Sequence, residues 1–209
     1  MENEFCNSMK QVKNKNHPQK GSSTVVEPIR EEKDIKAIRK LLSDHPRNHL
    51  LFVMGINNGL RTGDLLKLRV KDVAGMKPGD SIIIKEGKTK KQNILVINKT
   101  VHKILIQYLS ENSLSNDDYL FKSRKGNHPL TIQAVNAYMK KWTSAINLKG
   151  NYGAHSLRKT WGYFQRINYG VGFEVICKRF NHASPAVTMR YVGITDKEVE
   201  NILTNNEVG

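Results

Sequence analysis

Cysteine is scarce in this chain of 209 residues, since only Cys6 and Cys177 are present. One lies in a polar stretch and the other in a helical pattern, so they predict neither a disulfide framework nor a zinc site. Long apolar runs are missing as well, because the longest, Leu50 to Gly55, is far shorter than the roughly 20 residues that cross a bilayer. The N-terminal stretch has no apolar signal core. The sequence therefore predicts a cytoplasmic protein that has no membrane partner.

Acidic residues are few beside basic ones. The chain has 34 Lys and Arg against 19 Asp and Glu, which gives a formal charge of +15 and a pI of about 9.8. Such an excess usually means an anionic partner, and nucleic acid is the first candidate. Acidic lipid is the second, but no basic amphipathic anchor stands out. A glycine-rich phosphate loop, an internal repeat and metal-ligand spacing are all missing, so the sequence predicts no cofactor and no metal.

Residues 1–27 are the least patterned part of the chain. They are polar, rich in lysine and without periodicity, which predicts a flexible basic arm. Two interpretations stay open: an ordinary disordered terminus, or an arm that lies along a DNA backbone and adds salt-sensitive affinity. The remaining residues, 28–209, are enough for one well-buried domain but not for two large ones.

Helical periodicity dominates the chain after Pro28. The predicted helices cover about 31–43, 47–58, 99–111 and 131–147, with shorter ones at Thr62, over 173–180, after Ser184 and from Thr195. The only clear β signal is a pair of β-branched runs, 81–85 and 93–97, which predict an antiparallel hairpin. The predicted fold class is therefore α+β, mainly α, with one small antiparallel sheet.

Local signals mark helix ends and buried faces. The predicted end positions are Gly59 as a left-handed cap, Thr62, Thr131 and Ser184 as N-caps, and Pro185 as a first helical residue. The residues predicted to face the core are Val101, Ile104, Leu105 and Tyr108 in one helix, and Val135, Tyr138, Met139, Trp142 and Ile146 in another.

The last quarter of the chain gathers reactive side chains. His155 and Arg158 are three residues apart, so a helix places both on one face, within roughly 5–6 Å at Cβ. An imidazole beside a guanidinium fork suits a phosphate, because the fork grips two oxygens at once. Tyr191 follows His182, and a tyrosine hydroxyl close to arginines can be a nucleophile, since positive charge favours the phenolate. Each of these residues alone is more often structural or solvated.

Two upstream features bear on the same chemistry. Arg61 stands just before the predicted short helix at Thr62, where it is either a surface arginine or an arginine held at a helix start and aimed into a site. The tip of the predicted hairpin, EGKTKKQ, carries Lys88, Lys90 and Lys91. On composition alone, such a tip is usually solvated or touches backbone phosphate.

Four motifs follow one another along the chain, and their order and spacing matter for the interpretation. They are GLRTGDLLKLRVKDV, EGKTKKQ between two strands, HSLRK and NHASPAVTMRY. Together they resemble the first arginine motif, the lysine hairpin, the His-x-x-Arg motif and the His-to-Tyr segment of the tyrosine recombinases, the phage integrase family. The resemblance covers about residues 28–200. Two positions depart from it, because Asp64 stands where the family usually has Glu, and Asn181 where a glycine usually precedes the second histidine.

The resemblance implies the fold of a recombinase catalytic domain and a metal-independent reaction. The implied catalytic set is Arg61, Lys88, His155, Arg158, His182 and Tyr191. In the family's pattern, the two arginines clamp the scissile phosphate and the second histidine hydrogen-bonds it. The first histidine is the acid/base partner of the tyrosine nucleophile, and the lysine is the general acid. The next candidates are Tyr152, Tyr163 and Tyr169 for the nucleophile, and Lys90 and Lys91 for the acid.

The resemblance also implies a site-specific recombinase or integrase that cuts and rejoins double-stranded DNA. Family members work as tetramers on DNA, so we expect a tetramer there and a monomer or weak oligomer when free, in a bacterial or phage-infected host cell. The segment from Thr195 to Val208 is predicted either to dock on a neighbour or to pack on its own domain. The family's separate core-binding domain does not fit into the stretch before residue 28. Two rivals stay open: a DNA-binding regulator with little catalysis, and a type IB topoisomerase.

Overall fold

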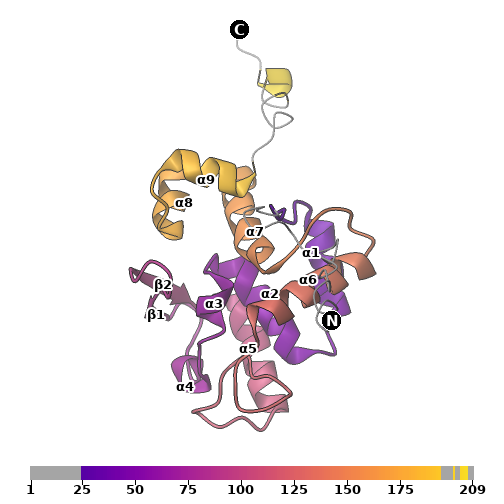
Figure 1. The fold of residues 1–209 in the computed structure, drawn as a ribbon, viewed down its shortest axis with the longest axis vertical. Helices are drawn as coiled ribbons and strands as arrows, with labels where there is room; N and C mark the ends of the chain where they lie inside the picture. The colour runs from indigo at the N-terminus through magenta and orange to yellow at the C-terminus, as the bar shows by residue number, and fades with distance from the viewer. Residues whose placement is uncertain (1–24, 194–199, 201–202, 207–209) are drawn as a thin grey trace, which may run out of the picture.

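The computed structural model describes residues 25–193, 200 and 203–206, and it confirms a mainly helical fold with one small sheet (Figure 1). The elements are α1 (Glu32–Leu41), α2 (Pro46–Asn58), α3 (Thr62–Leu65), α4 (Val70–Val73), β1 (Ser81–Lys85), β2 (Gln92–Val96), α5 (Lys99–Glu111), α6 (Ile132–Ala145), α7 (Ala154–Ile167), α8 (Phe173–Phe180) and α9 (Pro185–Val192). None of the helices in the described part is long and apolar enough to cross a membrane. The predicted helix from Thr195 begins outside the described residues. Residues 1–24, which make up most of the predicted arm, also lie outside them.

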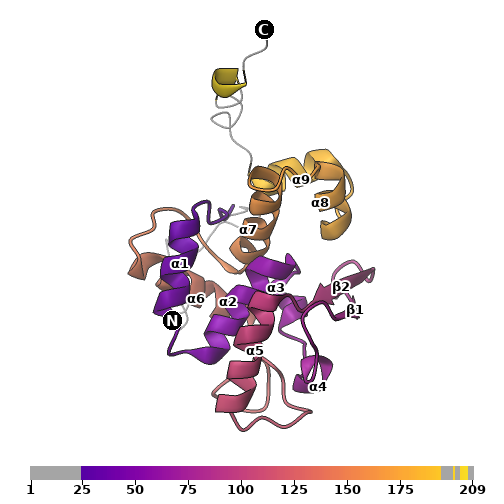
Figure 2. The same cartoon turned by 180° about the vertical axis from the view of Figure 1, so that it is seen from behind.

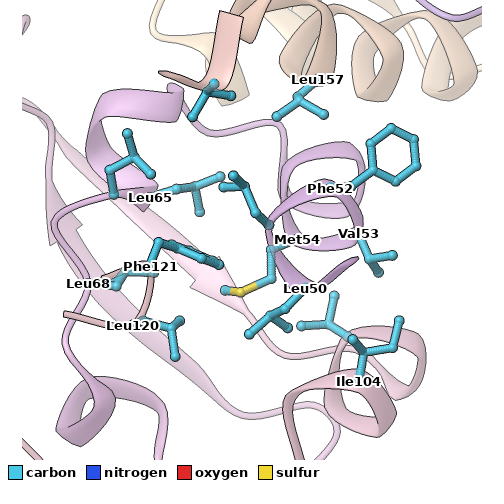
Figure 3. Packing of buried hydrophobic residues seen from close by; sticks show 14 of the residues in the cluster. Leu50, Phe52, Val53, Met54, Leu65, Leu68, Ile104, Leu120, Phe121 and Leu157 are labelled. Carbon is cyan, nitrogen blue, oxygen red and sulfur yellow. The ribbon is translucent and has the colours of Figure 1, made fainter. Parts of the chain in front are cut away.

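Helix α2 forms the centre of the core. Its residues from Leu50 to Gly55 are all buried, so the longest apolar run of the sequence is a core helix. Helices α5 and α7 both pack against it (Figure 1). In Figure 3, Leu50 and Met54 of α2 lie close to Ile104 of α5 and to Phe121 of the loop that follows α5. The helix ends at Gly59, whose φ of 58° is the predicted left-handed cap.

Helices α5 and α6 confirm the periodicity of the sequence. All four residues predicted to face the core from α5 are buried. In α6, Val135, Met139 and Trp142 are buried, whereas Tyr138 is only half-buried, as is Ile146 at the C-cap. Tyr138 stacks on Trp142, with ring centroids 5.7 Å apart, and turns its hydroxyl to the Arg47 guanidinium at 3.2 Å. The predicted cap of α6 is confirmed, because the Thr131 hydroxyl accepts a hydrogen bond from the backbone of Ala134 at 3.1 Å.

The two strands pair antiparallel in the register Ser81 with Val96 and Lys85 with Gln92. The second strand therefore begins and ends one residue earlier than predicted, because Ile97 bonds outside the ladder, to the backbones of Gly79 and Asp80. The hairpin lies on the α3 side of the helical core, away from α1 and α6 (Figures 1 and 2).

The prediction for Thr62 is wrong. Thr62 is the first residue of α3, and Arg61 occupies the N-cap position. The Thr62 hydroxyl does not accept from its own helix but donates to the carbonyl of Ala154 at 2.9 Å. Because Ala154 begins α7, this buried hydrogen bond joins the starts of two helices beside predicted site residues, since Arg61 precedes α3 and His155 lies in the first turn of α7.

Helices α8 and α9 pack together, and both contact α7 (Figure 2). Their shared apolar cluster consists of Tyr163, Ile176, Phe180 and Val192. The start of α9 is as predicted: Ser184 is the N-cap and Pro185 the first helical residue. Gly162 of α7 permits the close contact, since a Cβ there would lie 2.8 Å from the ring of Phe180.

Gly55 sets the distance between α2 and α7. A Cβ at this position would lie 2.9 Å from the Cβ of Leu157 in α7, an atom that cannot turn away without moving its helix. Gly55→Ala should therefore lower the free energy of unfolding by about 1–3 kcal/mol despite the better helix propensity of alanine, measured by urea denaturation.

Gly63→Ala is the matched control, because Gly63 is also helical and a Cβ there would meet only the tip of Ile132 at 3.4 Å. It should be neutral or stabilising by up to about 1 kcal/mol. Equal stability changes in the two variants would contradict the steric account of Gly55.

Candidate active site

All six predicted site residues line one cleft of about 860 Å³. They come from four parts of the fold: Arg61 from the turn between α2 and α3, Lys88 from the hairpin tip, His155 and Arg158 from α7, and His182 and Tyr191 from the α8–α9 segment. The first turn of α6, with Thr131 at its start, lines the same cleft. The structure thus brings together residues that are up to 130 positions apart in the sequence.

Arg158 forms the floor of the cleft and is only 1% exposed. Its guanidinium donates to the carbonyl of Gly59 at 2.8 Å and to the carbonyl of Phe180 at 2.6 Å, and it lies 4.2 Å from the centroid of the Phe180 ring. Burial lowers its pKa to about 10, so it stays cationic at neutral pH. A guanidinium has five N–H groups, and the two carbonyls do not use them all.

Arg61 is held from two sides. Its guanidinium forms an ion pair with Glu86 at the base of the hairpin and also reaches the carbonyl of Phe180 at 3.5 Å. Glu86 is fully buried, and nothing in the sequence pattern singles it out. Burial alone would raise the pKa of Glu86, but hydrogen bonds from Thr89, Asn93 and Arg61, together with the charge of Arg61, bring that pKa below its ordinary value. The carboxylate is therefore ionised.

Tyr191 points its hydroxyl to the Nδ1 atom of His155 at 3.5 Å. Its ring packs edge-on against Phe180 and His182, with centroid separations of 5.5 and 5.0 Å, and the Lys159 ammonium lies 5.0 Å from its centroid. Burial raises the pKa of Tyr191, and the opposing effects of the two arginines are smaller. The expectation that nearby positive charge favours the phenolate is thus outweighed by burial in the free protein, where the tyrosine is neutral.

Both site histidines are neutral as well. Desolvation, followed by the charges of Arg158 and Lys88, lowers the pKa of His155 below its usual value. The same two kinds of cause, burial and then the arginines, lower the pKa of His182 to about 4. The Nδ1 atom of His182 lies 3.1 Å from the hydroxyl of the buried Thr188, which fixes the plane of the ring. A neutral imidazole donates a hydrogen bond from one ring nitrogen and accepts at the other, and the lowered pKa values make both rings weaker bases than an ordinary histidine.

The two departures from the family's pattern are accommodated. Asn181 ends α8 with a φ of 50°, the left-handed conformation that asparagine tolerates better than most residues other than glycine. His182 consequently still reaches the cleft. Asp64 is buried and accepts a hydrogen bond from the backbone of Gly87 at 2.8 Å, so it ties α3 to the hairpin.

The structure separates the three hairpin lysines. Lys88 lines the cleft, and its charge contributes to the lowered pKa of His155. Lys90 and Lys91 do not line it, and Lys90 has a φ of 60° in the turn. Of the alternative tyrosines, Tyr152 donates its hydroxyl to the carbonyl of Lys149, outside the cleft. Within the described ranges, no group of three His, Cys, Asp or Glu side chains is arranged to hold a metal ion.

Comparison with known proteins identifies the family. The profile of the phage integrase family matches residues 28–198. The probable integrase/recombinase YoeC of Bacillus subtilis (strain 168) is 34% identical over 175 residues, which cover 82% of this chain and 92% of YoeC. The chain belongs to the phage integrase family, and its matched part is a tyrosine-recombinase catalytic domain.

Two solved structures share the fold. The crystal structure of XerA recombinase superimposes with a TM-score of 0.71 at 22% identity, over 88% of this chain and 66% of that one. XerH site-specific recombinase, in a post-cleavage complex with a palindromic difH substrate, gives a TM-score of 0.69 at 19% identity, over 90% of this chain and 55% of that one. Although the chain spans most of YoeC, it spans about half the length of other tyrosine recombinases that it matches.

The lowered pKa of His182 can be measured directly. We expect its ring to titrate near pH 4 rather than 6.5 in an NMR titration of the free protein, and Arg61→Ala should move the midpoint upward. Below pH 6.5 the unfolded chain binds a proton that the folded ring refuses until about pH 4, so the free energy of unfolding should fall between these values as pH falls. A midpoint near 6.5 would contradict the desolvation of this ring.

Proposed function

We propose that this protein is a site-specific recombinase that cuts and rejoins DNA strands through a 3′-phosphotyrosyl intermediate. The observation that carries the proposal is the single cleft, in which a half-buried tyrosine, with its hydroxyl toward a histidine, shares the lining with a lysine and two arginines. Membership of the phage integrase family supports it. The excess of basic residues supports DNA as the partner, since a net charge of +15 favours a polyanion.

The cationic floor of the cleft has the first task. A phosphodiester is an anion and repels a nucleophile, so the charge that gathers on its non-bridging oxygens has to be offset. Arg61 and Arg158 do this by donating from fixed guanidinium forks, and His182 adds a hydrogen bond. Donors already in place before the reaction are usually the largest single contribution to catalysis.

Proton transfer has the second task. Tyr191 is neutral in the free protein, so its hydroxyl has to lose a proton as its oxygen bonds to phosphorus, and the neutral His155 imidazole accepts it. The bond from phosphorus to the 5′ oxygen breaks, and the Lys88 ammonium donates a proton to that oxygen. The phosphotyrosine keeps the energy of the broken bond, so the 5′-hydroxyl of a second strand can rejoin it without ATP.

The assembly is proposed from the same reasoning. Exchange between two duplexes requires four such cleavages, so we propose a tetramer on DNA and a monomer or weak oligomer when free. Residues 1–27 carry several lysines and would add contacts to the backbone. The bacterial or phage-infected cell is the proposed setting.

Tyr191→Phe tests the proposal most directly, because it removes one oxygen and keeps the ring that packs on Phe180. We propose that a mobile element carries the gene, so the nicked suicide substrate is built on the DNA that flanks that element. With it, the wild type should form a covalent protein–DNA complex. The variant should bind this DNA normally and form none.

Tyr169→Phe is the control, since Tyr169 is 71% exposed and lies outside the cleft. It should behave as the wild type. A wild type that binds the DNA but forms no covalent complex would favour the regulator without catalysis, and a covalent complex in Tyr191→Phe would place the nucleophile elsewhere. A type IB topoisomerase would relax supercoiled DNA without exchanging strands.

The role of Lys88 as the general acid is tested by changing the leaving group. An ordinary thiol is acidic, with a pKa of about 8.5, so a thiolate leaves without a proton far more easily than an alkoxide does. Lys88→Ala should therefore cleave ordinary DNA very slowly and DNA with a 5′-bridging sulfur at close to the wild-type rate.

Lys90→Ala and Lys91→Ala are matched controls on the same hairpin, outside the cleft. Each should slow the cleavage of both substrates by the same factor, mainly because DNA binding is weaker. If sulfur rescues one of them and not Lys88→Ala, the acid is misassigned.

A further inference from the structure

Glu86 is a buried carboxylate behind the cleft, where it is paired with Arg61, a residue of the cleft lining. It is 0% exposed and lies two residues before Lys88, at the base of the hairpin turn. Burying an ionised carboxylate costs several kcal/mol unless it is paired and hydrogen-bonded. Glu86 meets both conditions: it forms an ion pair with Arg61 and accepts hydrogen bonds from the Thr89 hydroxyl and, at 2.9 Å, from the Asn93 amide.

On one side, Glu86 fixes the turn that carries Lys88. The Thr89 hydroxyl next to Lys88 donates to the carboxylate. The backbone of Glu86 closes the turn, because its carbonyl accepts from Lys90 and its N–H donates to Lys91, both at 3.0 Å. The chain on both sides of Lys88 is therefore held by one residue.

On the other side, Glu86 connects this turn to the arginines. Its ion pair with Arg61 holds the guanidinium at the cleft. The amide of Asn93, which donates to Glu86, also donates to the carbonyl of Arg179 at 3.1 Å, and the Arg179 guanidinium returns a bond to Asn93 at 2.7 Å. Arg179 in turn donates to the carbonyl of Asn58 at 2.9 Å, at the end of α2. The hairpin is thus joined to the helical core beside Arg61.

The charge of Glu86 works against the binding of an anion, because a negative group beside Arg61 offsets part of the attraction for a phosphate. Attraction for the DNA is therefore not what Glu86 contributes. Its contacts instead fix the direction of the Arg61 guanidinium and the position of the turn that carries the Lys88 ammonium.

We propose that Glu86 is a positioning residue for DNA cleavage, which aims the Arg61 guanidinium at the scissile phosphate and holds the Lys88 turn over the cleft. The inference rests on the proposed function. It predicts that loss of the carboxylate charge separates binding from cleavage, whereas a purely structural role would weaken both together.

Glu86→Gln keeps the shape of the side chain and removes its charge. Single-turnover cleavage of the suicide substrate should fall on the order of 100-fold, the effect of misplacing a reacting group by about 1 Å. DNA affinity should stay the same or rise. Asp118→Asn is the matched control, since Asp118 pairs with Lys122 at 2.8 Å outside the cleft, and it should change neither measurement.

Two further variants test the path of the effect. In an Arg61→Ala background, Glu86→Gln should reduce the cleavage rate much less than it does in the wild type, because the guanidinium that Glu86 orients is gone. Thr89→Val loses one hydrogen bond to Glu86 without burying a new charge, so it is suited to test the Lys88 turn even if Glu86→Gln folds poorly. It should slow cleavage of ordinary DNA and leave cleavage of 5′-thio DNA near the wild-type rate.

The outcomes are distinguishable. If the wild type itself forms no covalent complex, the proposed function fails. If the wild type cleaves and Glu86→Gln cleaves equally well, the positioning role is wrong. It is also wrong if Glu86→Gln loses DNA affinity and cleavage rate in the same proportion, or if it slows cleavage as much in the Arg61→Ala background as in the wild type. A Thr89→Val variant that is slow on both substrates would likewise overturn the link to Lys88.

Discussion

The burial of the Arg158 guanidinium is the constraint on which the site depends. A cation taken out of water needs partners, and those of Arg158 are the carbonyls of Gly59 and Phe180. Gly59 ends α2 and Phe180 ends α8, so one side chain ties both helix ends to α7. The same group therefore acts as a structural joint and as the proposed phosphate clamp. Because it is already held in place, little reorganisation is needed when an anion arrives, and this is the condition for strong electrostatic catalysis.

Burial and the cations of the cleft together shift the pKa values of three of its side chains, His155, His182 and Tyr191. The two histidines have lowered pKa values because they are desolvated among positive charges, and Tyr191 remains neutral because burial outweighs the arginines. A bound phosphate would offset part of that positive charge. On this basis the proposed nucleophile stays protonated and the proposed base stays neutral in the free protein, and we infer that proton transfer between them begins only once the cleft holds an anion.

Much of the fold could be predicted because its signals are local. The buried face of α5 follows from helical spacing, and the ends of α2 and α6 follow from Gly59 and Thr131. The six site residues were chosen from sequence motifs alone, and all six line a single cleft in the structure. Thr62 was mispredicted because its partner, the carbonyl of Ala154, is 92 residues away. Glu86 was missed because, within a lysine-rich hairpin tip, a buried glutamate and a solvated one have the same local sequence.

The arginines have one further property in common, which explains why they gather where they do. The last carbonyls of a helix have no partner within it and carry partial negative charge. The carbonyl of Phe180 at the end of α8 accepts from Arg158 and lies near Arg61, and the end of α2 accepts from Arg158 and Arg179. Both helices terminate at a residue in the left-handed conformation, Gly59 and Asn181, which ends the helix sharply. The cationic floor of the cleft is therefore built where two helix ends meet, and the residues that stop those helices are as much a part of its design as the arginines themselves.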